Sequence, residues 1–199
     1  MDTRVNLRVE QGVATRSALI AAARELFAQK GYHEAGTNDL VAAANVTRGA
    51  LYHHFQDKEA LFEAVFLDLA RELHREATLA IQPFGVDRWR QLQEGLQAHL
   101  RLIAGSRAMQ RVLLVDGPAV FGWSKWRALQ SEFSLGSLVV AMEELIATEA
   151  IQPRPPLLAA HLVLAVLNEA ALLIAHSDKP EETLAEVGEI MRAMVTGLR

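Results

Sequence analysis

The side chains with the most distinctive chemistry lie close together in one short segment of the chain. Arg48 can donate two parallel hydrogen bonds to O6 and N7 of a guanine. Tyr52 joins a flat apolar ring to a hydroxyl that can donate to a phosphate oxygen, and neutral His53 and His54 can donate to a phosphate or to a base. Lys58 adds a positive charge at an expected helix start, where free backbone N–H groups also attract phosphate. This set of residues predicts contact with a nucleic-acid duplex.

Small and hydroxylated residues in the same segment would let the backbone approach such a partner closely. Gly49 and Ala50 add no bulk, and Gly49 inside a helix costs roughly 0.5–1 kcal/mol relative to Ala. That cost is understandable where closeness to a partner matters. Thr37 and Thr47 offer hydroxyls at two helix starts. The residues expected at the interface are Thr37, Asn38, Thr47, Arg48, Gly49, Ala50, Tyr52, His53, His54 and Lys58.

Three helices must position these side chains. Apolar residues recur at helical spacing over residues 15–30, which predicts the first helix. A second, shorter helix is expected over residues 37–44, with the hydroxyl of its first residue available as the N-cap. Asn45 follows at a sharp turn, because Asn tolerates the left-handed conformation better than other residues with a side chain. Thr47 then caps a third helix that ends near Phe55. Two short helices joined by a tight turn are the pattern of a helix-turn-helix.

The rest of the chain also predicts helices, and no segment alternates convincingly as a strand would. A long apolar face begins at Lys58, and further helices are expected over residues 88–104, 107–115, 123–148, 157–176 and 181–198. The fold class is therefore all-α, with about nine helices. A three-helix head (residues 1–58) is joined by a long helix to a helical body (residues 59–199).

Composition limits the other classes of protein. The 199 residues are 51% hydrophobic and 22% charged, which is ordinary for a folded globular chain. The chain has no Cys, so it can form no disulfide or thiolate metal site, and a reducing cytoplasm is the expected location. Its beginning lacks the pattern of a secretory signal. The most apolar stretch, residues 157–175, is broken by His161, Asn168 and Glu169, which disfavours a membrane span.

The net charge is −4, but its distribution is uneven. Residues 1–58 carry 7 Lys and Arg against 6 Asp and Glu, whereas residues 59–199 carry 13 against 18. Any contact with a polyanion is therefore expected in the first quarter of the chain only.

The first third of the sequence resembles the DNA-binding domain of the TetR family of bacterial repressors. One departure is Asn45, where the family usually has Gly. The residues that carry the resemblance are Gly31-Tyr32, Thr37, Ala44-Asn45-Val46-Thr47, Gly49, Leu51-Tyr52, His54-Phe55, Lys58 and Leu61.

The resemblance implies a homodimer that binds a palindromic DNA operator and releases it when a small molecule enters the body. Its two recognition helices would lie about one DNA turn apart, roughly 34–36 Å. The last two helices would form the dimer interface. The residues expected there are Leu158, Leu162, Val166 and Leu173 on one helix, and Leu184, Val187, Met191 and Val195 on the other.

The resemblance predicts an effector pocket but not its contents. Bulky residues in the body favour an aromatic or hydrophobic effector. Several of these residues also have simpler interpretations: Trp123 and Trp126 as core anchors, Asp116 as a helix-end carboxylate, and His99 as a structural histidine. The candidate ligand-binding residues are Trp89, His99, Met109, Gln110, Leu113, Asp116, Phe121, Trp123, Trp126, Phe133 and Asn168.

The main hypothesis is a ligand-responsive regulator, and two alternatives stay open beside it. An enzyme is disfavoured because no nucleophile elbow, phosphate loop or HExxH motif is present. A helical ligand carrier that no longer binds DNA is the second. No cofactor or metal is expected, since His161 and His176 lie too far apart on one helix to share an ion. Arg4 and Arg8 could reach a minor groove, although a disordered tail is the preferred interpretation.

Overall fold

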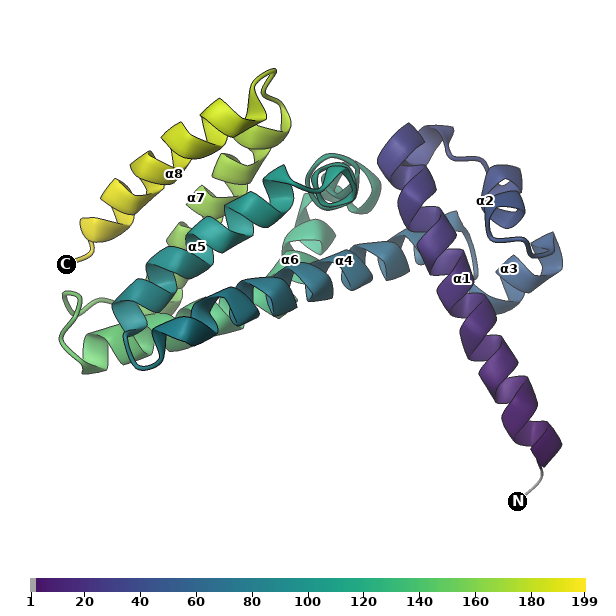
Figure 1. The fold of residues 1–199 in the computed structure, drawn as a ribbon, viewed down its shortest axis with the longest axis horizontal. Coiled ribbons are helices and arrows are strands. Elements are labelled where there is room, and N and C mark those ends of the chain that lie inside the picture. Colours follow the sequence, from purple (N-terminus) through teal and green to yellow (C-terminus); the bar gives the residue numbers. More distant parts are fainter. Residues whose placement is uncertain (1–2) are drawn as a thin grey trace.

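The computed structural model describes residues 3–199, with side chains from Glu10 onward. These residues form an all-α fold with no β-strand among them (Figure 1). Eight α-helices are present in the described chain, because the helix expected at residues 107–115 is a π-helix instead. The elements are α1 (Thr3–Glu34), α2 (Thr37–Ala43), α3 (Arg48–His54), α4 (Lys58–Ile81), the 3₁₀ turn η1 (Gln82–Phe84), α5 (Arg88–Ala104), the π-helix η2 (Met109–Asp116), α6 (Gly117–Ala147), α7 (Pro156–Ala175) and α8 (Pro180–Thr196).

The head consists of α1, α2 and α3 around one apolar cluster that also takes in the first turns of α4. Leu19 and Phe27 of α1 are almost completely buried, as are Leu40 of α2 and Leu51 of α3. Helices as short as α2 and α3 are not stable alone, so their stability comes from this packing against α1 and α4.

The connection between α2 and α3 follows the sequence prediction. Asn45 has a φ of 52°, the left-handed conformation expected of it. The Thr47 hydroxyl accepts a hydrogen bond of 3.1 Å from the backbone N–H of Ala50 and caps α3. The start of α2 differs from the prediction, because Gly36 takes the N-cap position and Thr37 is the first helical residue. The Thr37 hydroxyl is therefore free of a capping role.

The first helix is longer than the periodicity of its apolar residues indicated. It begins at Thr3 rather than near residue 15. The prediction covered only the later part of the helix, because the sequence before it shows no apolar stripe. Its helical path is interrupted at Gly31, where φ is 80°. Glycine reaches this conformation at no steric cost. The side chains of Arg4 and Arg8 lie outside the described residues.

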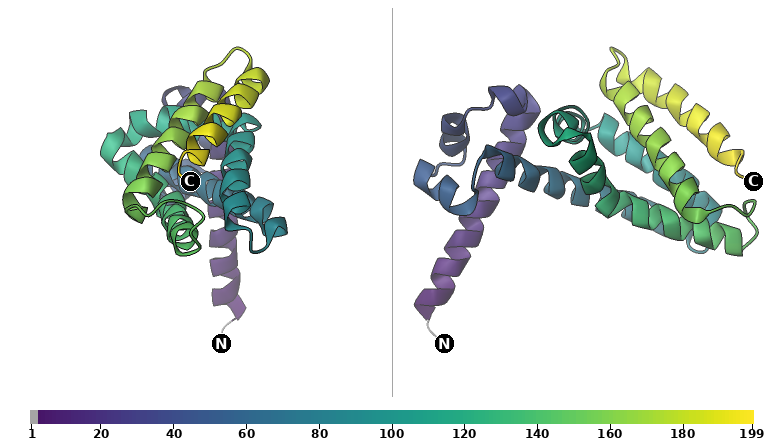
Figure 2. Two further views of the ribbon diagram at one scale, coloured as in Figure 1. Left: turned by 90° about the vertical axis from the view of Figure 1, so that its left-hand side faces the viewer. Right: turned by 180° about the vertical axis from the view of Figure 1, so that it is seen from behind.

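The long helix α4 connects the head to the body (Figures 1 and 2). Asp57 caps its start by accepting a 2.7 Å hydrogen bond from the N–H of Ala60. One face is buried along its length, against α1 in the head and against α5 and α6 in the body. The buried residues are Leu61, Phe62, Val65, Phe66, Leu69 and Leu73.

The body is formed by the rest of α4 with α5, η2, α6, α7 and α8. Helix α6 is bent at Gly122, whose φ of 72° interrupts the helical path between the two parts. Trp126 of α6 is only 2% exposed, and its indole Nε1 donates a 2.7 Å hydrogen bond to the carbonyl of Leu113 in η2. The carbonyl groups of a π-helix do not follow the regular α-helical pairing. The Leu113 carbonyl accepts from the Trp126 indole, and this hydrogen bond fixes α6 against η2.

Helix α7 is long and apolar enough to cross a membrane by length and composition, with a mean hydropathy of 2.1 in its most apolar window. It is packed on one side against α5, α6 and α8. Its other side exposes Leu158, Leu162 and Leu173. The high apolar content of α7 therefore serves two faces, one inside the body and one on its surface.

The buried indole hydrogen bond gives a test of the junction between α6 and η2. We expect Trp126→Phe to lower the free energy of unfolding by about 1–3 kcal/mol, because the Leu113 carbonyl would be left buried without a donor. Trp123→Phe is the matched control: this side chain is 64% exposed, so its replacement should change stability by less than about 0.5 kcal/mol. Urea unfolding followed by circular dichroism measures both. Equal losses in the two variants would contradict the assignment.

Candidate nucleic-acid interface and ligand cavity

The outer face of α3 is open to solvent at the end of the molecule remote from α7 and α8 (Figure 1). Arg48, Gly49, Tyr52 and His53 are exposed, and Tyr52 is 45% exposed although its ring is large and apolar. The only fully buried side chain of the helix is that of Leu51. The residues predicted for α3 therefore share one accessible surface.

Arg48, Tyr52 and Thr37 lie together on this surface. The Arg48 guanidinium lies 5.7 Å from the centre of the Tyr52 ring. The hydrogen bond from Arg48 lowers the pKa of the Tyr52 phenol, and Thr37 adds a smaller effect in the same direction. Three donors from α2 and α3 thus point into one region, which is how a helix-turn-helix places side chains against base edges and the phosphates beside them.

Gly49 has no steric reason within the protein to be glycine. A Cβ atom added there would lie 3.8 Å from the Thr47 hydroxyl oxygen, an ordinary van der Waals distance. The backbone of Gly49 is not in the left-handed region either. The helix therefore carries a destabilising residue at a position where alanine would fit.

Lys58 does not lie as the sequence suggested. Its ammonium donates hydrogen bonds to the carbonyl groups of Tyr32 (2.9 Å) and Ala35 (3.3 Å), and it sits 4.3 Å from the centre of the Tyr32 ring. The side chain is directed inward because these carbonyls, at the interrupted end of α1, would otherwise lack donors. Its position at the start of α4 was predictable, but its partners were not.

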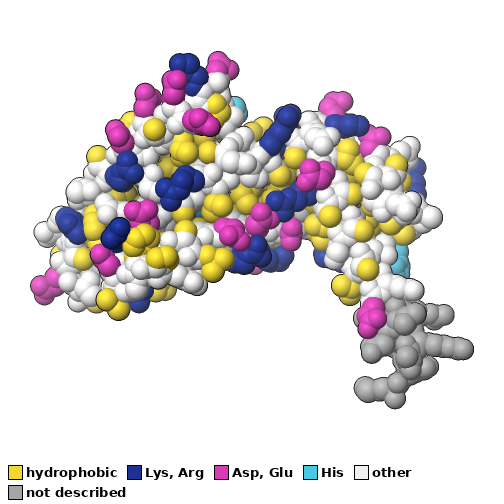
Figure 3. Space-filling model, in the orientation of Figure 1, with side chains coloured by type: hydrophobic (Ala, Val, Ile, Leu, Met, Phe, Trp, Pro, Cys, Tyr) yellow, Lys and Arg dark blue, Asp and Glu magenta, His cyan; other side chains and the backbone are white. Residues whose placement is uncertain are grey.

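The acidic side chain of α2 is paired within the head, whereas Asp57, before α4, lies close enough to Tyr52 to oppose the lowering of the phenol pKa. Asp39, early in α2, pairs with Lys30 at 2.7 Å, and the hydrogen bond from Lys30 lowers the pKa of this carboxyl. On the face of the body drawn in Figure 3, basic and acidic side chains are interspersed, with acidic ones along α8. The body thus offers no basic surface there that would compete with the head for a polyanion.

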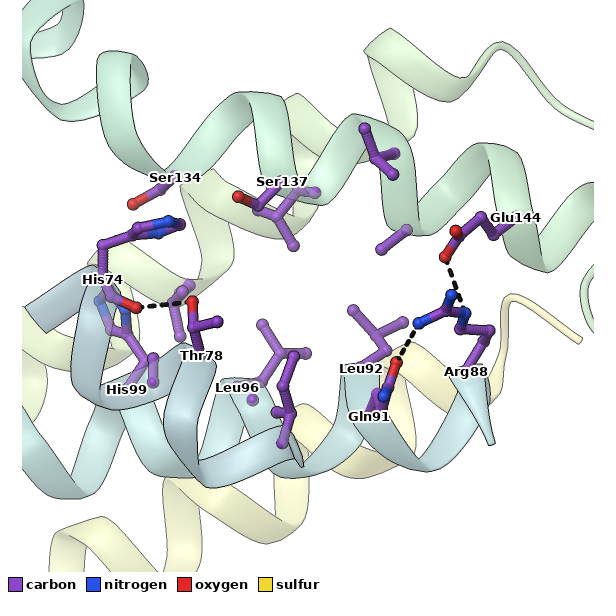
Figure 4. Close-up of a pocket in the computed structure, with 17 residues that line it drawn as sticks. His74, Thr78, Arg88, Gln91, Leu92, Leu96, His99, Ser134, Ser137 and Glu144 are labelled. Carbon is purple, nitrogen blue, oxygen red and sulfur yellow. Dashed lines mark hydrogen bonds and ion pairs between the residues drawn. The ribbon is translucent and has the colours of Figure 1, made fainter. Parts of the chain in front are cut away.

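A cavity of about 220 Å³ lies in the body between α4, α5 and α6, far from α3. Its middle is lined by aliphatic side chains, among them Leu92, Leu96 and Leu138. The imidazole and charged side chains lie at its two ends, and the Ser137 hydroxyl lies between them (Figure 4). An apolar cavity with a few polar groups is the usual form of a small-molecule site. We call it the main cavity because α4, the helix that connects head and body, forms one of its walls; a second cavity, between α6 and α7, has a similar volume of about 260 Å³.

The two ends of the main cavity differ in charge. At one end the Arg88 guanidinium pairs with Glu144 (Nε to Oε2, 3.0 Å) and donates from Nη1 to the Gln91 side chain at 2.8 Å. At the other end lie two imidazoles, of His74 and His99, with the Ser134 hydroxyl beside them (Figure 4). Burial lowers the pKa of His99 to about 4, so this imidazole is neutral near pH 7.

A small inner cavity of about 30 Å³ continues from the imidazole end. It shares His99 and Ser134 with the main cavity and reaches Leu113 and Leu114 of η2. Gln130 of α6 also lines it, and the Gln130 Oε1 atom is buried without a hydrogen-bond partner among the described residues. The inner cavity therefore connects the main cavity to the π-helix.

Of the ligand-binding residues expected from the sequence, His99 alone lines the main cavity. Leu113, Phe133 and Asn168 line the inner cavity. Trp123, Trp126 and Asn168 line a separate cavity between α6 and α7. The residues that the sequence analysis missed are His74, Thr78, Arg88, Gln91, Ser134, Ser137 and Glu144. In the sequence, each of them is only a polar residue among the apolar residues of a long helix. That pattern does not indicate which other helix its side chain will face.

The other residues expected at a ligand line none of these cavities and make contacts elsewhere in the protein. Met109 is buried in the core, and Phe121 packs against Phe62 and Phe66 with ring centres 5.3 and 5.5 Å apart. Gln110 donates to two carbonyl groups at the end of α5. The Trp89 ring lies beneath the guanidinium of Arg199.

Asp116 is the most instructive of these corrections. It is 5% exposed, and its Oδ2 accepts a 2.8 Å hydrogen bond from the backbone N–H of Tyr32 in the head. Arg111 donates to both of its oxygens at 3.2 Å and lies across Gly31, where an added Cβ would come within 2.2 Å of the guanidinium. Asp116 therefore joins the body to the head rather than meeting a ligand.

The expected dimer face is partly correct in its exposure. Leu158, Leu162 and Leu173 of α7 are exposed. On α8, however, Met191 and Val195 are buried within the chain, while Leu184 and Val187 are partly buried against the same core. The exposed apolar residues of α8 are Ile190 and Met194 instead. Helix α8 carries two apolar stripes, one buried and one exposed. The periodicity of the sequence identified the buried stripe.

Two sequence profiles match the chain. One, described as bacterial regulatory proteins of the tetR family, matches residues 19–65. The other, described as a tetracyclin repressor-like C-terminal domain, matches residues 89–198. A solved structure of a TetR-family transcriptional regulator from Pectobacterium atrosepticum is 30% identical, with a TM-score of 0.81 over 95% of this chain and 96% of that one.

Two curated relatives match shorter parts. The probable acrEF/envCD operon repressor of Escherichia coli (strain K12) is 39% identical over 110 residues, 53% of this chain and 48% of that protein. The HTH-type transcriptional regulator UidR of the same strain is 42% identical over 62 residues, 31% of this chain and 32% of that protein. The chain spans about half the length of the first relative and about a third of the second.

The inward position of Lys58 gives a prediction that separates a structural role from phosphate binding. We expect Lys58→Ala to lower the free energy of unfolding by about 1–2 kcal/mol, since two carbonyl groups lose a charged donor. The slope of log affinity for duplex DNA against log salt should stay unchanged, whereas loss of a phosphate contact would reduce it by about one.

Lys30→Ala is the matched control, because this exposed pair with Asp39 should contribute little to stability. Urea unfolding and DNA titrations at several salt concentrations measure the two effects. A reduced salt slope with unchanged stability would restore the phosphate contact expected from the sequence.

Proposed function

Because the chain belongs to the TetR family of bacterial transcriptional regulators, we propose that it is a repressor that binds an inverted-repeat DNA operator as a homodimer and releases it on binding a small molecule. The observation that carries the proposal is the open face of α3, where Arg48, Tyr52 and Thr37 converge beside a glycine that the protein itself does not require. A protein that acts on a bacterial operator works in the cytoplasm.

The proposal assigns α3 to the major groove. Arg48 then reads a guanine, Tyr52 contacts a sugar or a thymine methyl group, and Thr37 and His53 contact phosphates. Gly49 brings the helix backbone close to the duplex. The remaining residues expected at this interface (Asn38, Thr47, Ala50 and His54) stay in the proposal at its edges, with Thr47 also serving as the cap of α3.

The proposal assigns dimer formation to the outward face of α7 and α8. Exposed apolar side chains are contiguous there, and a groove lined by Leu162, Val166 and Met194 lies between the two helices. An apolar surface of this kind on a globular protein marks an interaction site. Two copies joined through it would present two α3 helices to one duplex, as an inverted repeat requires.

The route from ligand to DNA runs through η2. The inner cavity, which shares His99 and Ser134 with the main cavity, adjoins Leu113 and Leu114 of η2, and Asp116 at the end of the same π-helix holds the N–H of Tyr32. A ligand that displaces η2 therefore changes how the head is held against the body. Effector and operator then weaken each other's binding by the same factor.

The alternative of a ligand carrier without DNA binding predicts a different result in one titration. A labelled duplex selected from random sequences should bind the repressor with a sequence-dependent component at fixed salt. A carrier would show only weak binding that is the same for every sequence.

The position of Gly49 gives the sharpest mutational test of DNA binding. Gly49→Ala should raise the free energy of unfolding by roughly 0.5–1 kcal/mol and still weaken operator binding, because the added methyl group separates the helix from the duplex. Gly136→Ala is the control, since Gly136 also lies inside a helix with open space around it but in the body. It should be stabilised without losing operator affinity. Full affinity in Gly49→Ala would remove α3 from the groove.

The Asp116 junction gives a test of the route to the head. Asp116→Ala leaves the Tyr32 N–H and the Arg111 guanidinium without their acceptor, at a cost of about 1–3 kcal/mol. We expect thermal unfolding to separate into two transitions as the head loses its hold on the body. Asp178→Ala, in the exposed turn after α7, should keep one transition. Differential scanning calorimetry measures this, and a single unshifted transition in Asp116→Ala would rule out the route.

A further inference from the structure

We propose that the main cavity takes an uncharged, mostly aliphatic molecule whose one hydroxyl group is bound at the inner end by His99, Ser134 and Gln130. This assignment rests on the proposed function, since it names the chemical class of the effector. Three observations support it: the charged side chains of the cavity are paired with each other, its wall is aliphatic, and the Gln130 Oε1 atom beside it has no hydrogen-bond partner among the described residues.

The charged side chains of the cavity are paired with each other at one end and leave the rest of its wall uncharged. Arg88 and Glu144 are the only Lys, Arg, Asp or Glu side chains that line it, and they pair with each other at 3.0 Å. Gln91 takes a further N–H of the guanidinium. A carboxylate or ammonium group in the apolar part or at the imidazole end would lie without a counter-ion, which is costly. The Arg88–Glu144 pair is itself 43% and 39% exposed, so it contributes little to this preference.

The wall of the cavity is aliphatic. No Phe, Tyr or Trp lines the main cavity, whose apolar residues are Ala, Val, Ile and Leu side chains from α4, α5, α6 and α7. The bulky aromatic residues of the body that seemed suited to an effector lie outside it. Between the two polar ends shown in Figure 4, the space is therefore suited to a hydrocarbon chain or a saturated ring system.

The inner end requires a hydrogen-bond donor from outside the protein. Gln130 lines the inner cavity and also the cavity between α6 and α7. Its Oε1 atom is buried and has no partner in the described part of the chain, and an acceptor left in this state costs free energy. The neutral His99 imidazole and the Ser134 hydroxyl can each donate or accept. The inner cavity of about 30 Å³ has room for a group the size of a water molecule.

A hydroxyl group satisfies all three partners at once. It donates to Gln130 Oε1 and accepts from both Ser134 and His99 through its two lone pairs, with no change in charge. A carboxylate could not donate to Gln130, and an ammonium would meet no anion at this end. The chemistry of the inner end thus selects an alcohol over an acid or an amine of the same length.

The test compares three probes of equal length: 1-decanol, decanoate and decylammonium. Isothermal titration calorimetry of the full chain at pH 7.5 should show 1-decanol binding at least about tenfold more tightly than either ion. Equal or tighter binding of decanoate or decylammonium overturns the assignment. So does the absence of 1-decanol binding.

Variants then test the three partners. Gln130→Leu and Ser134→Ala should each weaken 1-decanol binding about fivefold, the effect of one neutral hydrogen bond. Gln130→Leu removes an unpartnered polar atom, so the protein should stay folded. Ser131→Ala is the control on the same helix, because Ser131 lines the cavity between α6 and α7 instead. A loss in Ser131→Ala equal to that in Ser134→Ala would place the alcohol elsewhere.

Operator binding without ligand separates this inference from the proposed function. If the ligand-free protein binds a selected operator by fluorescence anisotropy and decanoate is the preferred probe, the effector class is wrong and the repressor function stands. If no operator is bound, the repressor function fails whichever probe the cavity prefers.

Discussion

The backbone of Tyr32 is the point on which the arrangement of head and body depends. Its N–H donates to Asp116 of the body, and its C=O accepts from Lys58 at the start of α4. The Tyr32 ring meanwhile packs against Phe27 and Phe62, with centroid distances of 6.0 and 5.1 Å. Two charged side chains from distant parts of the chain thus hold the backbone of one residue. Arg111 donates to Asp116 beside it, and the absence of a side chain at Gly31 leaves room for the guanidinium.

This junction explains why a cavity in the body can matter to a surface at the opposite end of the molecule. The π-helix η2 borders the inner cavity through Leu113 and Leu114 and ends at Asp116. Trp126 fixes it from the other side by a buried hydrogen bond. A packed segment with so many fixed contacts cannot deform gradually, so a ligand that moves it must move the head as well.

The head was predicted more accurately than the body. The turn at Asn45, the cap at Thr47 and the exposed face of α3 all follow from residues a few positions apart. In the body, the Asp116 carboxylate meets the head, and Met191 and Val195 are buried within the chain at the base of the groove between α7 and α8. In each case the residue type and its periodicity were identified correctly, but the side of the helix that meets each neighbour was not.

The sequence by itself determined the helices, the turn between α2 and α3 and the set of donors that α3 presents, because these depend on hydrogen bonds and sterics within one or two helical turns. The tertiary structure alone decided which side chains line the cavity, and that Lys58 and Asp116 hold the Tyr32 backbone. Tyr32 and Asp116 are 84 positions apart, and contact between them depends on how whole helices pack. Amphipathic periodicity limits that packing but does not fix it.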